Sequence, residues 1–132
     1  MQSFRLLLIG VMVHSGAFAQ MSDTVNCPQL VAAVEAAAVV DAYHARCRGD
    51  GSGRRMDNLN QLLVNTRRIT VLTIEDECFP EHDYRRAQQR LEQDFTIQLE
   101  QMGGCAAAKA AGMIAQFTAR YHAALAAVRA LP

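Results

Sequence analysis

Residues 27–47 read CPQLVAAVEAAAVVDAYHARC, a run with a cysteine at each end. Its apolar side chains recur at spacings of three and four, which is typical of one face of an α-helix. They are Leu30, Val31, Val34, Ala38 and Ala42. We expect this helix to begin near Pro28, with Thr24 or Asn26 as its cap. It should end at Gly49, where a loop rich in glycine begins.

Three further helices are predicted along the chain. The second is expected from about residue 55 to 76, and its stripe contains Leu59, Leu62, Leu63, Thr66 and Ile69. The β-branched run 69–74 leaves a strand open, but no second strand is predicted to pair with it. The third is expected to open at Pro80 and to stop at Gly103, and its stripe contains Tyr84, Ala87, Leu91, Phe95, Leu99 and Met102. The fourth is expected over 105–130, with Ile114, Phe117, Tyr121, Leu125 and Val128.

The four cysteines, Cys27, Cys47, Cys78 and Cys105, allow three pairings. At a rise of about 1.5 Å per residue, the first helix would hold its two cysteines about 30 Å apart. They cannot bond each other, because bridged Cα atoms lie within about 7 Å. If the four helices alternate in direction, Cys78 returns to Cys27 and Cys105 to Cys47. The sequence therefore predicts an all-α, up-down four-helix bundle with disulfides Cys27–Cys78 and Cys47–Cys105.

Residues 1–19 have the pattern of a secretory signal peptide. Arg5 precedes the apolar run 6–13, and the small-residue cleavage pattern Ala-Phe-Ala stands at 17–19. The apolar run is well short of the roughly 20 residues that span a bilayer. We therefore expect an exported single domain over 20–132, periplasmic or secreted, with no membrane span after cleavage. Abundant alanine and arginine in place of lysine suggest a bacterial source.

Composition and motifs exclude several classes of function. The chain carries 13 basic and 13 acidic residues, so it lacks the basic excess that nucleic-acid binding needs. Neither Ser22 nor Ser52 lies in the Gly-x-Ser-x-Gly elbow of hydrolases. The cysteines form no Cys-x-x-Cys pair, which argues against zinc, redox and covalent haem sites. We expect no catalytic residue, no metal and no cofactor.

Charge is nevertheless segregated along the chain. Residues 46–68 are rich in arginine, whereas residues 75–83 are acidic. The acidic run offers the oxygen ligands that calcium takes, but a solvated connection before a helix is the favoured interpretation. Oppositely charged ends can steer a protein partner. The candidate partner-binding residues are Arg48, Arg54 and Arg55 at the basic end, and Glu75, Asp76 and Glu77 at the acidic end.

Two hypotheses for function follow. The first is a non-enzymatic protein-binding module of the bacterial envelope, such as an inhibitor, an immunity-type protein or a secretion accessory. Its partner would be another envelope or secreted protein. The second is a carrier of a small apolar ligand or haem, which predicts an open apolar cavity lined by residues such as Phe95, Met102, Phe117 and Tyr121. His44 and His122 each follow a tyrosine, and we interpret them as surface residues unless they share a cleft.

Overall fold

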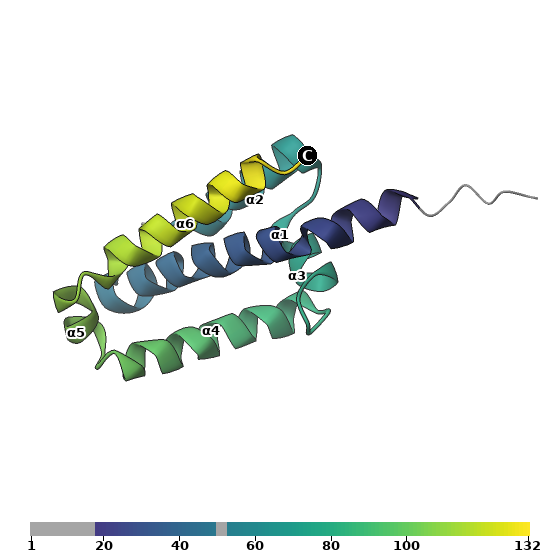
Figure 1. Cartoon of the computed structure of the whole chain (residues 1–132). Coiled ribbons are helices and arrows are strands. Elements are labelled where there is room, and N and C mark those ends of the chain that lie inside the picture. The colour runs from purple at the N-terminus through teal and green to yellow at the C-terminus, as the bar shows by residue number, and fades with distance from the viewer. Residues whose placement is uncertain (1–17, 50–52) are drawn as a thin grey trace, which may run out of the picture.

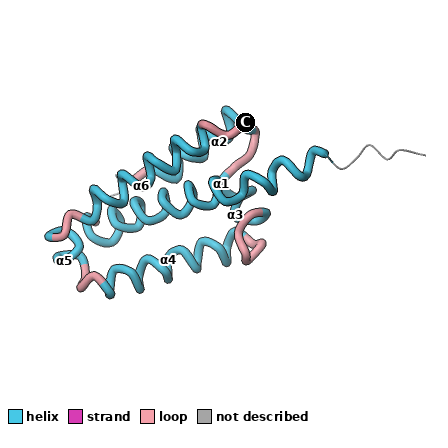
Figure 2. The backbone as a smooth tube through the Cα atoms, viewed as in Figure 1, coloured by secondary structure: helices cyan, strands magenta, loops and turns pink. Residues whose placement is uncertain are grey.

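The structure, a computed structural model, describes residues 18–49 and 53–132. Over these residues its regular secondary structure is all helical, with loops between the helices and no strand (Figure 2). The elements are α1 (Phe18–Tyr43), the π-helical turn η1 (His44–Arg48), α2 (Arg55–Arg67), α3 (Val71–Glu77), α4 (Tyr84–Gln101), α5 (Cys105–Ala110) and α6 (Met113–Arg129). The predicted signal segment 1–19 lies outside the described residues except for its last two, which open α1.

Helix α1 is the centre of the fold. It contacts α2, α3, α4 and α6. Figure 1 shows α2 and α6 along one side of α1 and α4 along the other, with α5 joining α4 to α6 at one end. The long helices α1, α2, α4 and α6 alternate in direction, so the predicted up-down helical bundle is confirmed.

Both predicted disulfides are present. Cys27 is bonded to Cys78 and Cys47 to Cys105, each with its Cα atoms 5.3 Å apart. The first bridge ties α1 to the end of α3, and the second ties η1 to the start of α5. Each closes one end of the bundle, as the alternating helix directions require. Disulfides form and persist in oxidising compartments, so the chain fits an environment outside the cytosol.

The core is built from small residues of α1 and larger ones of its neighbours. Ala33, Ala37 and Val40 are at most 1% exposed, and their short side chains let neighbouring helices approach closely. The large side chains that fill the space against them are Leu59, Leu63, Ile74, Phe79, Phe95, Phe117, Tyr121 and Val128. Among the described residues, no helix combines the length and apolar character needed to cross a membrane.

Helix α1 begins at Phe18, so the prediction of a start near Pro28 is wrong. A proline inside a helix removes the hydrogen bond to the carbonyl four residues earlier. Its ring nevertheless holds φ near the helical value, so helix can continue on its N-terminal side. The predicted end is confirmed, because Gly49 follows η1 in the left-handed conformation.

The second predicted helix is interrupted, and residues 69–74 belong to no strand. Arg68 adopts a left-handed conformation with φ of 59°, which ends α2. Thr70 then caps α3, its hydroxyl accepting from the Thr73 amide at 3.1 Å. The Asn60 side chain accepts from the Val71 amide at 2.9 Å. Local side-chain bonds therefore replace the helical bonds that a continuous helix would need.

The last two predicted helices also differ at their ends. The chain turns over 78–83 and α4 starts at Tyr84, not at Pro80, because Asp83 caps it by accepting from the Arg86 amide at 3.0 Å. Buried Phe79 and bridged Cys78 hold the preceding turn in place. The expected helix over 105–130 is divided into α5 and α6 by a left-handed Gly112, with φ of 66°.

Candidate functional site

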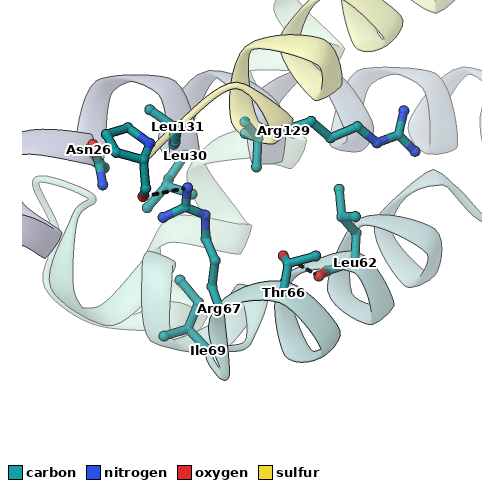
Figure 3. A pocket seen from close by; sticks show the side chains of 10 residues that line it. Asn26, Leu30, Leu62, Thr66, Arg67, Ile69, Arg129 and Leu131 are labelled. Carbon is teal, nitrogen blue, oxygen red and sulfur yellow. Dashed lines mark hydrogen bonds between the residues drawn. The ribbon is translucent and has the colours of Figure 1, made fainter.

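A groove lies between α2 and α6, and its first part is near the C-terminal residues (Figure 3). This part has a volume of about 340 Å³. Its apolar residues are Leu30, Leu62, Ile69, Val128 and Leu131, and its polar ones include Asn26, Thr66, Arg67 and Arg129. The Arg67 guanidinium reaches across and donates to the Pro132 carbonyl oxygen at 3.4 Å.

The second part of the groove continues toward the start of α2. It has a volume of about 500 Å³. Helix α2 contributes Arg55, Asn58, Gln61, Leu62 and Asn65, and α6 contributes Tyr121, His122, Leu125 and Arg129. Because Leu62 and Arg129 line both parts, the two parts adjoin. We call the combined surface the α2–α6 groove.

The α2–α6 groove is cationic. Its charged side chains are Arg55, Arg67 and Arg129, with His122 beside them. None of the described residues that line either part is an aspartate or glutamate. Asn58, Gln61 and Asn65 are exposed and add amide donors and acceptors along α2. The arrangement is therefore suited to acidic or carbonyl-rich ligands.

Arg55 is held at one end of the groove without full use of its hydrogen-bond donors. Its Nε is buried and has no hydrogen-bond partner among the described residues. The guanidinium carbon lies 5.8 Å from the centroid of the Tyr121 ring, and the Tyr121 hydroxyl donates to the Arg55 carbonyl oxygen at 3.5 Å. Burial raises the pKa of Tyr121, although the positive charge of Arg55 opposes the shift. The phenol therefore stays neutral and remains a donor.

Asp41 of α1 positions this end of α2. Its two carboxylate oxygens accept from the backbone amides of Arg55 at 2.9 Å and Met56 at 3.0 Å. These amides belong to the first turn, where no helical acceptor exists and a negative charge is favoured. Gly53 passes so close that a Cβ there would lie 3.0 Å from the Asp41 side chain. The start of α2 is thus fixed against α1, and Arg55 with it.

The other predicted basic residues do not join Arg55 in the groove. Arg48 is exposed at the end of η1, and Arg54 is exposed at the N-cap of α2. Neither lines the α2–α6 groove. Of the three candidates at the basic end, the structure brings only Arg55 together with other polar residues of a concave surface.

Most acids of the predicted acidic end have structural partners. Asp76 accepts from the Tyr84 amide at 2.6 Å, and Asp83 caps α4. Glu81 is paired with Arg90, which holds the pKa of Glu81 below its usual value. Glu77 is exposed. Among the described residues no group of His, Cys, Asp and Glu is arranged to hold a metal ion.

Glu75 differs from these acids, because it is 1% exposed and is not part of an exposed acidic surface. Neither of its carboxylate oxygens has a hydrogen-bond partner among the described residues. Burial raises the pKa of Glu75, the nearby Gln88 side chain opposes the shift, and Asp76 adds to it. Glu75 lines a separate pocket of about 360 Å³ between α1, α3 and α4.

The residues of the alternative hypothesis lie in the core. Phe95, Phe117 and Tyr121 are at most 3% exposed, and Met102 is partly buried against the same core. The Phe117 ring packs against Tyr43, with ring centroids 6.2 Å apart. His122 lines the α2–α6 groove, whose lining does not include His44.

The groove contains residues that sequence reasoning did not single out. Arg67 and Arg129 were not candidates, because they are far apart in the chain and neither belongs to a motif. The polar face of α2 carries a usable signal, since Arg55, Asn58, Gln61 and Asn65 recur at spacings of three and four. The tertiary structure alone shows that α6 lies opposite this polar face of α2.

Comparison of the chain with family models, with curated proteins and with solved structures finds no match.

Proposed function

We propose that this chain is an exported, non-enzymatic protein-binding module of the bacterial envelope that binds an acidic segment of a partner in the α2–α6 groove. The observation that carries the proposal is that every charged side chain in the described lining of the groove is basic. Three arginines and a histidine lie along it, and none of its described lining residues carries a carboxylate side chain. A partner segment rich in Asp and Glu is complementary to such a surface.

The unpaired donor at Arg55 supports the same conclusion. A buried guanidinium Nε without a partner is unfavourable, and a change of the Arg55 side-chain rotamer would let it bond a carboxylate in the groove. The exposed amides of Asn58, Gln61 and Asn65 would bond the backbone of an extended segment. Leu62 and Leu125 provide apolar contact between the polar groups.

Export is part of the proposal. The pattern of residues 1–19 is that of a cleaved signal, and both disulfides require an oxidising compartment to persist. All four cysteines are used in these bridges, so none is available as a nucleophile. An inhibitor, an immunity-type protein and a secretion accessory all fit a small disulfide-linked binder.

The test is capture of partners from an envelope extract by the immobilised chain and by charge-reversal variants. Arg55→Glu and Arg129→Glu should remove a set of proteins that the unmodified chain retains. Arg120→Glu is the matched control, because Arg120 is exposed on the same helix as Arg129 but does not line the groove. The affinity of a captured protein should fall about tenfold or more with either groove variant and should weaken with salt. Equal capture by all four proteins would contradict the proposal.

A further inference from the structure

The pocket at Glu75 is a second concave site, distinct from the α2–α6 groove. Its described lining comes from five elements: Ala38, Asp41 and Ala42 of α1, Ala45 of η1, Met56 of α2, Glu75 of α3, and Gln88, Leu91 and Glu92 of α4. Its volume of about 360 Å³ lies within the roughly 300–1,000 Å³ usual for small-ligand sites. The walls are largely apolar, and the three charged residues that line it are all acidic.

The three acids have different roles. The Asp41 carboxylate already accepts two backbone bonds from α2. Glu92 is exposed. Glu75 is buried to 1% exposure and has no hydrogen-bond partner for either oxygen among the described residues. Burial of a carboxylate without a hydrogen-bond partner costs free energy, because the charged group loses its hydration. Such a group in a pocket marks a candidate binding site.

We propose that this pocket binds a protonated amine or a guanidinium carried on a short alkyl stem, with its charge beside Glu75 and its stem against Leu91, Met56 and the alanines of α1. A positive group would give the Glu75 carboxylate a charged partner in place of the neutral Gln88 amide that lies beside it. The apolar walls would hold the stem. A bare metal ion does not fit this site, because among the described residues no cluster of metal-ligating side chains is found.

Access to Glu75 requires a side chain to move. Both of its oxygens are closed to solvent, whereas Gln88 is exposed and Met56 is half-buried. Both are long and unbranched, so either can change rotamer at low energetic cost. Gln88 lies close enough to Glu75 to lower its pKa, so its amide is the group that a cation would displace.

The cation can come from a free amine or from a lysine or arginine side chain of a peptide. The disulfide-bonded chain is titrated with n-butylammonium and followed by amide NMR shifts. Saturating shifts should centre on Ala42, Glu75 and Leu91, and 1-butanol, which has the same stem without charge, should bind much more weakly. Butanol binding as tight as butylammonium, or no saturating shift with butylammonium, would overturn the proposal.

Two variants assign the binding to the carboxylate. Glu75→Gln keeps the shape of the side chain and should weaken butylammonium binding about tenfold or more. Glu77→Gln is the matched control on the same helix, because Glu77 is exposed and does not line the pocket. Equal affinity of the unmodified chain and Glu75→Gln would overturn the proposal. A blocked lysine tripeptide that binds as well as butylammonium supports a peptide as the source, and one that does not bind supports a free amine.

Discussion

Replacement of Glu75 by glutamine should make the protein more stable at neutral pH. The side chain is 1% exposed and its two oxygens have no hydrogen-bond partners among the described residues. A buried polar group without a partner costs about 1–3 kcal/mol, and a charged one costs more. Because the amide of glutamine also needs partners, we expect Glu75→Gln to recover only part of this, about 1–2 kcal/mol. At this chain length that corresponds to about 4–8 °C in Tm.

The sign of the pH dependence follows from the raised pKa of Glu75. Burial is the main cause, and Asp76 adds to it. Between the unfolded and folded pKa values the folded state binds more protons, so the free energy of unfolding falls as pH rises through this window. Below the window Glu75 is protonated in both states, and the variant should gain little.

The assay is urea unfolding followed by helix circular dichroism, since the chain has no tryptophan. Measurements from about pH 4 to about pH 8 with the disulfides intact should show the advantage of Glu75→Gln growing with pH. Glu77→Gln is exposed on the same helix and should match the unmodified chain at every pH. A variant at Glu75 that is less stable at neutral pH, or that keeps the original pH slope, would refute the view that its carboxylate is buried without a partner.

Three further predictions concern the fold. Removal of the Cys27–Cys78 bridge by double alanine substitution releases a loop with a sequence separation of 51, and should lower the free energy of unfolding by about 4 kcal/mol in denaturant titrations. Asp41→Ala removes the acceptor of two first-turn amides of α2, and should cost about 1–2 kcal/mol and increase amide exchange at Arg55. Phe117→Ala leaves a cavity in the core and should cost about 3–5 kcal/mol, with a lowered Tm by calorimetry. Unchanged amide exchange at Arg55 in Asp41→Ala would contradict the capping role of Asp41. An unchanged Tm in Phe117→Ala would contradict the role of Phe117 in the core.

The acidic run at 75–83 shows that the sequence reveals where carboxylates gather but not the structural role of each one. As a sequence it is five carboxylates before a helix, and a solvated connection was the favoured interpretation. The structure assigns Asp76 and Asp83 to backbone amides, pairs Glu81 with Arg90, and buries Glu75. The partners of Asp83, Asp76 and Glu81 lie three, eight and nine residues along the chain. The burial of Glu75, in contrast, depends on packing beside α1 and α4, which the sequence around it does not specify.

Some helix ends are set by the conformational preference of one residue, and others by hydrogen bonds between neighbouring segments. Gly49 and Gly103 were predicted as stops, because glycine adopts positive φ without penalty. Arg68 also adopts positive φ, although arginine carries no such preference. Its conformation is supported by the cap at Thr70 and by Asn60 on the preceding helix. The break after α2 was therefore missed because its stabilising bonds lie on both sides of it.

The sequence by itself determined the helical class and excluded a Cys27–Cys47 bridge, and with alternating helix directions assumed it predicted both disulfide pairs. These follow from hydrophobic period, from the length of a helix and from the short reach of a disulfide, all of which are local or one-dimensional quantities. Only the tertiary structure decided that α2 and α6 enclose a cationic groove and that Glu75 turns inward beside α1 and α4. Those features depend on which faces of separate helices meet, because burial and the charge of a concave surface are set by contacts between residues distant in the chain.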